Sequence, residues 1–220
     1  TTIGRFEENA VSVNSGLQID DTIIAVDGRR IIAINDLSYA FTNVKDSKID
    51  ITVKRDGKKV ELKDVEFASE KVQGMDVLTI DFAVYGQKKT VGSYITNTVK
   101  TAASYSVVIW RSLVDLLSGK YGISQVSGPV GVTVALADIA KQNLASLLPM
   151  MAFISINLGI FNLLPIPALD GGRLMFILYE MIFRKPVPQK FESLVHTVGF
   201  VLLFGFMILI VAKDILGLIF

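Results

Sequence analysis

Two long stretches without charged residues constrain the fold of this chain more than any other feature. Residues 143–169 contain 27 consecutive uncharged residues, and residues 193–212 contain 20 if the single histidine, His196, is neutral. A helix needs about 20 predominantly apolar residues to cross a bilayer. We therefore predict two transmembrane segments, 143–169 and 193–219. A pair of buried core helices in a soluble protein is the alternative.

Charge is distributed unevenly along the chain. Residues 1–90 contain 13 Lys+Arg and 15 Asp+Glu, whereas residues 91–220 contain 9 and 6. This division predicts a soluble domain followed by a membrane domain. The formal net charge of +1 argues against nucleic acid as a partner. The absence of cysteine excludes disulfide scaffolds, thiolate zinc sites and cysteine nucleophiles.

The connector between the two spans, residues 171–192, predicts the orientation in the membrane. Its charged residues are mainly basic: Arg173, Arg184, Lys185 and Lys190 against Glu180 and Glu192. Basic loops stay on the cytoplasmic side. We therefore expect this helix or loop to be cytoplasmic and the soluble domain to lie outside.

Residues 93–131 lead into the first span. Apolar residues recur at helical spacing over 93–118, interrupted by Lys100, Arg111 and Asp115. We expect an amphipathic helix on the outer membrane surface there, and a third span is the alternative. Residues 119–131 contain four Gly and one Pro, which predicts a loop or a re-entrant turn.

The soluble domain, residues 1–67, alternates short β-like runs with turns. Strands are predicted at 21–26, 49–55 and 58–62, with Asp-Gly turns at 27–28 and 56–57 and one short helix at 37–43. Residues 68–92 are expected to be a connector to the membrane domain, residues 93–220.

Residues 14–31 resemble the core signature of a bacterial protease-type PDZ domain. The matching residues are Gly16, Leu17, Asp21, Ile23, Val26 and Gly28, whereas Asp20 stands where the pattern has Gly. The resemblance implies that a peptide or C-terminus binds as an added strand, near Gly16 and Leu17. A passive spacer or substrate filter is the alternative. The predicted fold is therefore α+β: a small β-rich, PDZ-like domain followed by an α-helical membrane domain with two transmembrane helices and an amphipathic surface helix.

The end of the first span carries the pattern most suggestive of chemistry. Asp170 closes the uncharged run, Pro165 and Pro167 break any helix before it, and Asn162 lies within the apolar segment. An ionisable group at membrane depth is costly and indicates function. We expect the span to unwind around a polar cavity that receives Asp170. The alternative is that Asp170 caps the next helix, 171–183.

The pattern N-x-x-P-x-P-x-x-D-G at 162–171 resembles a signature of the site-2 protease family of intramembrane zinc metalloproteases. Residues 127–131, S-G-P-V-G, resemble a second segment of that family. The resemblance implies that Asp170 is a zinc ligand beside two histidines of an H-E-x-x-H motif, whose Glu would be the general base. It implies that Asn162 contacts substrate or stabilises the oxyanion, and that Pro165 and Pro167 shape the substrate-binding stretch.

The chain departs from the family pattern because it contains no H-E-x-x-H. His196 lies outside the family motifs, and we expect it to be a helix-start or interfacial histidine. We expect the two histidine ligands and the Glu base in a part of the protein that precedes Thr1, and we expect this chain to be inactive alone.

The sequence therefore favours the C-terminal part of an intramembrane zinc metalloendopeptidase of the bacterial cytoplasmic membrane. Single-span membrane proteins such as anti-sigma factors are the expected substrates. A non-catalytic, membrane-anchored PDZ adaptor or pseudoprotease is the second hypothesis, and a transporter with a broken span is the third.

Overall fold

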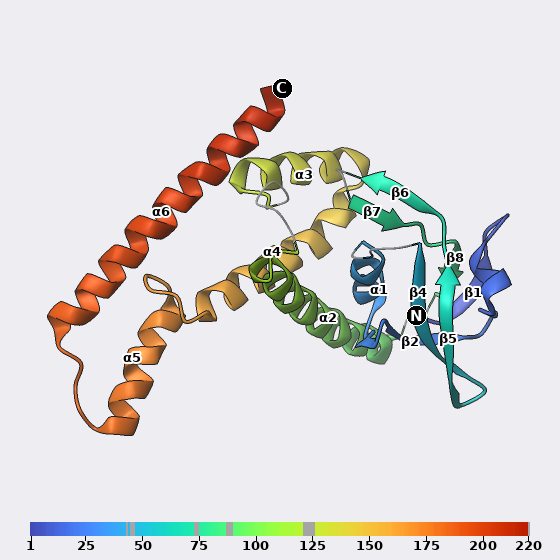
Figure 1. The fold of residues 1–220 in the computed structure, drawn as a ribbon, viewed down its shortest axis with the longest axis horizontal. Helices are drawn as coiled ribbons and strands as arrows, with labels where there is room; N and C mark the ends of the chain where they lie inside the picture. The colour runs from blue at the N-terminus through green and yellow to red at the C-terminus, as the bar shows by residue number, and fades with distance from the viewer. Residues whose placement is uncertain (43, 45–46, 73–74, 87–89, 121–125, 220) are drawn as a thin grey trace. The chain divides into compact units, whose positions relative to one another are not determined.

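The computed structural model describes residues 1–42, 44, 47–72, 75–86, 90–120 and 126–219. It divides into two compact units, Thr1–Val108 and Ile109–Phe220. Strands lie in the first unit, and the second is helical among its described residues (Figure 1). A mixed helix-and-strand chain with two candidate membrane helices agrees with the predicted class.

A four-stranded antiparallel sheet forms the centre of the first unit. Its order is β3 (Arg29–Arg30), β2 (Thr22–Val26), β4 (Lys48–Arg55) and β5 (Lys58–Glu66). Both predicted Asp-Gly turns close hairpins in this sheet. Asp27 and Gly28 have φ of 46° and 72°, and Asp56 and Gly57 have φ of 49° and 79°. Two consecutive positive φ angles characterise the type I′ turn, whose twist matches that of the strands.

Helix α1 (Ile34–Phe41) covers part of this sheet and begins three residues before the predicted helix. The earlier start follows from Asp36, whose Oδ2 accepts the backbone N–H groups of Ile32 (2.9 Å) and Ala33 (3.0 Å). Asp36 is the third residue of α1, and a carboxylate at this position can bind back to the N-cap amide, here that of Ala33, and fix the helix start. Asn43, in the predicted helix, lies outside the described residues.

Residues that were expected to form a connector belong to the folded first unit. Strands β6 (Ser69–Val72) and β7 (Met75–Leu78) form a hairpin, and β8 (Phe82–Val84) pairs with β1 (Ile3–Phe6). Leu78 and Phe82 are 3% and 5% exposed. Residues 68–92 were expected to be a connector, but 69–72, 75–78 and 82–84 form strands of the first unit, and β8 pairs with β1 at the start of the chain.

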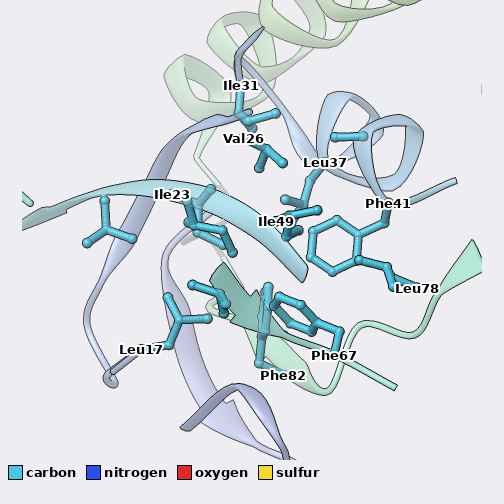
Figure 2. Packing of buried hydrophobic residues seen from close by; sticks show 14 of the residues in the cluster. Leu17, Ile23, Val26, Ile31, Leu37, Phe41, Ile49, Phe67, Leu78 and Phe82 are labelled. Carbon is cyan, nitrogen blue, oxygen red and sulfur yellow. The ribbon is translucent and has the colours of Figure 1, made fainter. Parts of the chain in front are cut away.

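The core of the first unit lies between the strands and α1 (Figure 2). Alternate residues of β4, Ile49, Ile51 and Val53, are buried, as expected for a strand with one face on the core. Phe41 of α1 meets Phe67 edge to face, with ring centroids 4.7 Å apart.

The second unit contains the candidate membrane helices. Its helices are the end of α2 (Val91–Leu117), then α3 (Pro129–Gln142), α4 (Leu147–Leu163), α5 (Asp170–Phe183) and α6 (Gln189–Ile219). The helix predicted over 93–118 is present as α2, and its place on the membrane surface stays a prediction. The last residues of the predicted loop 119–131 are helical, because α3 begins at Pro129.

Two described segments, Leu144–Leu163 and Gln189–Gly217, are long and apolar enough to cross a membrane. In their most apolar windows, 0% and 11% of residues are buried inside the protein. Buried core helices of a soluble protein would be mostly covered. Apolar side chains on the outside are what a spanning helix presents to lipid.

Candidate functional site

The first candidate span is interrupted where its prolines predicted an interruption. Helix α4 ends at Leu163, and Leu164 is extended, with φ −63° and ψ 143°. The helical conformation is disfavoured for a residue that precedes proline. This accounts for the extended Leu164, directly before Pro165, and for the end of α4 at Leu163. Residues 164–169, here called the proline turn, then lead into α5.

Backbone hydrogen bonds close the proline turn on itself. The N–H of Ile166 donates to the carbonyl of Leu164 (2.7 Å), and that of Leu169 donates to the carbonyl of Ile166 (3.2 Å). Ala168 has a φ of 76°, a left-handed conformation that is uncommon for a residue with a Cβ. Such a conformation persists only where the surroundings hold it.

Glycines allow the proline turn to be packed closely. A Cβ at Gly171 would overlap the carbonyl oxygen of Leu164, and one at Gly172 would lie 2.5 Å from that of Ile166. On α6, a Cβ at Gly199 would lie 2.7 Å from the carbonyl oxygen of Pro167. The Gly-Gly pair after Asp170 therefore lets the start of α5 contact the backbone of the turn.

Asp170 is the first residue of α5, and Leu169 occupies the N-cap position without a side-chain capping bond. The structure therefore does not show the alternative in which Asp170 caps the helix. Among the described residues, no hydrogen bond or ion pair engages the Asp170 carboxylate. Both of its oxygens are available to a cation or a ligand.

An open cavity of about 430 Å³ lies beside Asp170. It is lined by Ala168, Leu169, Asp170, Arg173, Gln189, Glu192, Ser193 and His196. The lining joins the proline turn and α5 to the first two turns of α6. This is the polar cavity expected around Asp170.

The other site residues predicted in this region, Asn162, Pro165 and Pro167, do not line this cavity. Asn162 is half-buried in the last turn of α4, and Pro165 is exposed. Pro167 lines a separate apolar cavity of about 510 Å³ between the proline turn and α6. The structure thus places Asn162, Pro165 and Pro167 on or beside one turn, and only Asp170 of the four in the polar cavity.

His196 contacts the proline turn, which sequence reasoning missed. Its Nδ1 accepts the backbone N–H of Ala168 at 3.0 Å, 28 residues away. A neutral imidazole that accepts at Nδ1 carries its proton on Nε2. Since neither nitrogen then offers a free lone pair, His196 in this arrangement is not a metal ligand. No periodicity or motif in the sequence pointed to this contact.

The chemistry of the cavity residues is compatible with one protein ligand to zinc, the carboxylate of Asp170. An unengaged carboxylate beside an open cavity suits Zn²⁺, but a catalytic zinc takes three protein ligands and an open position. No group of three or more His, Cys, Asp or Glu in the described ranges could hold a metal ion. Asp170 as a zinc ligand therefore stays a prediction.

The S-G-P segment is attached to the last helix. Asp214 Oδ2 accepts the backbone N–H groups of Gly128 (2.9 Å) and Gly131 (2.8 Å) at the start of α3. Lys213 Nζ donates to the carbonyl of Val126 and lies 3.4 Å from Asp214 Oδ1. Nothing in the sequence assigned a role to Asp214, although a carboxylate late in an apolar helix was a usable signal.

In the first unit, the PDZ-resembling segment is bound to β4. Arg55 makes a bidentate pair with buried Asp21, with both N···O distances 2.7 Å, and donates to the carbonyl of Gly16 (2.8 Å). The hydrogen bond to Asp21 raises the pKa of Arg55. Asp20 has a φ of 72°, a left-handed conformation that glycine, the residue of the pattern at this position, adopts readily.

Gly16 and Leu17, which were predicted to bind peptide, make contacts within the first unit itself. The Leu17 side chain is 2% exposed in the core, and the N–H of Gly16 donates to the carbonyl of Val13. Peptide binding at these two residues stays a prediction.

Comparison with known proteins decides the family. A family model described as peptidase family M50 matches residues 21–206. The chain belongs to peptidase family M50. This family is that of the site-2 proteases, as the motifs at 127–131 and 162–171 suggested.

Named relatives agree with this family. SAS1196 of Staphylococcus aureus (strain MSSA476), which carries a zinc metalloprotease name, is 33% identical over 223 residues. The regulator of sigma-W protease RasP of Bacillus subtilis (strain 168) is 32% identical over 215 residues. These alignments cover 98% and 97% of this chain but 52% and 50% of the relatives. The chain thus spans about half the length of the relatives it matches.

Proposed function

We propose that this chain is the C-terminal part of an intramembrane zinc metalloendopeptidase. The observation that carries the proposal is the unengaged carboxylate of Asp170, which follows a broken apolar helix and opens on a polar cavity. Membership of peptidase family M50 and relatives named as zinc metalloproteases support the same chemistry.

Asp170 would hold Zn²⁺ together with two histidines of an H-E-x-x-H motif. We place those histidines and the Glu base in the part of the full-length protein that lies outside this chain. When bound, the zinc would polarise the scissile carbonyl and lower the pKa of a water molecule. The proline turn fixes the start of α5, so it would also fix the position of the Asp170 carboxylate.

Asn162 and the two prolines would handle the substrate. Pro165 and Pro167 keep residues 164–169 out of a helix, so this stretch could lie against an unwound substrate strand. Asn162, half-buried one turn before Pro165, would donate its side-chain amide to the substrate backbone or to the developing oxyanion. Non-helical backbone at membrane depth requires a protein-lined or watery cavity, which hydrolysis inside a membrane also requires.

We propose single-span membrane proteins such as anti-sigma factors as substrates. One relative is named as a regulator of sigma-W protease. The site would lie in the bacterial cytoplasmic membrane, with residues 171–192 on the cytoplasmic side and the first unit outside. That unit would act as a PDZ-like domain that binds a peptide end or excludes untrimmed substrates.

The test is the substitution Asp170→Asn in the full-length protein, in proteoliposomes with a single-span model substrate. We expect normal membrane insertion, loss of zinc during dialysis and loss of nearly all cleavage. Asp138→Asn, on the exposed side of α3, is the matched control and should retain zinc and activity. Full zinc content and turnover in the Asp170 variant would remove Asp170 from the metal site.

The second hypothesis is a membrane-anchored PDZ adaptor or pseudoprotease. It predicts that full-length protein binds peptide ends but neither zinc nor a cleavable substrate. The zinc content of the unmodified protein separates the two hypotheses.

A further inference from the structure

Helix α6 contacts the proline turn through two residues that lie on the same face of the helix. His196 accepts the N–H of Ala168, and Gly199, three residues later, packs against Pro167. Residues three apart lie on the same side of a helix. The two residues that precede Leu169 and Asp170 are therefore fixed from outside the turn.

We propose that His196 is a positioning residue for Asp170. Its Nδ1 fixes the Ala168 amide, and this fixes the direction in which the chain enters α5. The catalytic consequence rests on the proposed function above, whereas the contact itself does not. His196 touches neither metal nor substrate in this role.

The conformation of Ala168 explains why an acceptor is needed. A left-handed residue with a Cβ is strained, and a part-buried backbone N–H such as that of Ala168 is stabilised by a fixed acceptor. The Ala168 amide is part-buried beside the polar cavity, so only part of its surroundings could supply water in place of a missing acceptor. The hydrogen bond from the Ala168 N–H to His196 therefore stabilises the observed backbone conformation of residues 164–169 relative to other conformations of the same segment.

The second ring nitrogen of His196, Nε2, indicates that packing alone does not explain why a histidine occupies this position. Nε2 is buried and has no hydrogen-bond partner among the described residues. The Phe176 ring lies against the imidazole, with centroids 5.8 Å apart. A buried unpaired donor is costly, so an apolar side chain would pack better here if no acceptor were needed at Nδ1.

Three substitutions separate the acceptor from the bulk of the side chain. His196→Asn places an amide oxygen near the position of Nδ1, and His196→Gln places its amide near Nε2. His196→Phe keeps a ring and removes the acceptor. Thr197→Val is the control, since the exposed Thr197 hydroxyl donates within α6, to the carbonyl of Ser193.

The first readout is hydrogen exchange of the peptide spanning 164–170 in the metal-free, full-length protein in nanodiscs. We expect about tenfold faster exchange at Ala168 in the Gln and Phe variants, the size of one lost hydrogen bond. The Asn and Thr197 variants should exchange as the unmodified protein does. Unchanged exchange in both the Gln and Phe variants would overturn the proposal.

The second readout is zinc retention against a competing chelator, together with kcat and KM for a model substrate. We expect weaker retention and lower kcat in the Gln and Phe variants, with recovery in the Asn variant. Faster exchange without any change in retention or kcat would overturn the positioning role. Absence of zinc from the unmodified protein would defeat the proposed function, whereas the exchange result would still decide whether His196 holds the turn.

Discussion

The backbone N–H of Gly131 donates a 2.8 Å hydrogen bond to Oδ2 of Asp214, which also accepts the N–H of Gly128. One carboxylate of the last helix thereby satisfies two donors at the start of α3. The first N–H groups of a helix lack partners within the helix. In an apolar environment this attachment stabilises the S-G-P segment, because water does not compete for the same donors.

Substitution of Asp214 should therefore destabilise the second unit. Asp214→Ala leaves two N–H groups without their acceptor, which we expect to cost about 2–4 kcal/mol, whereas Asp214→Asn keeps one oxygen acceptor and should cost less. Thermal unfolding in nanodiscs measures both. Asp138→Ala, which removes an exposed ion pair with Lys141, should cost less than about 1 kcal/mol. Equal stability of the Ala variants at 214 and 138 would contradict this role.

Gly199 should not tolerate a side chain. In Gly199→Ala the new methyl group meets Pro167, and overpacking typically costs about 1–3 kcal/mol. Because the strain falls on the proline turn, zinc retention should weaken as well. Gly205→Ala on the same helix is the control, since its Cβ meets nothing within 4 Å. Helix propensity favours alanine there by up to about 1 kcal/mol, so a loss of stability at 205 as large as at 199 would refute the explanation.

The ion pair of Asp21 with Arg55 should be important for the first unit. Asp21 has 0% side-chain exposure, and Arg55 has 25%. Asp21→Ala leaves Arg55 without its carboxylate and Gln18 without an acceptor, which we expect to cost about 3 kcal/mol. Hydrogen exchange of β2 and β4 in the full chain measures the loss. Glu61→Ala, which removes an exposed pair with Lys59, should leave exchange in both strands unchanged.

Leu78 tests whether residues 69–84 belong to the first unit. Its side chain is 3% exposed within the core. Leu78→Ala should destabilise the unit by about 2–5 kcal/mol, as truncation of buried leucines does, with faster exchange in β4 and β8. Lys71→Ala, at an exposed position of β6, is the control. An unaffected β4 in the Leu78 variant would show that the hairpin is an appendage.

Local features account for the predictions that the structure confirmed. The Asp-Gly turns at 27–28 and 56–57 were predictable because two positive φ angles need residues that tolerate them. The end of α4 before Pro165 was predictable because proline restricts its predecessor. The helix start at Ile34 was missed by three residues, since it depends on Asp36 binding two amides upstream.

The same distinction between local and long-range features applies to the candidate site. Asp170 could be singled out because a carboxylate that closes an apolar run is conspicuous in a sequence. The roles of His196 and Asp214 could not be predicted, because each depends on an amide in a distant segment. The pairing of β8, within 68–92, with β1 could not be predicted for the same reason, since the two strands lie at opposite ends of the first unit's sequence.

The sequence by itself determined which segments are apolar enough to span a membrane, where the first one breaks and which carboxylate follows the break. These properties depend on neighbouring residues, through hydrophobicity and backbone sterics. Only the tertiary structure decided that His196 meets Ala168 and that Asp214 meets Gly131, 28 and 83 residues apart. Such contacts arise when packed helices bring unpaired backbone donors to an acceptor, and no local pattern in the chain encodes that meeting.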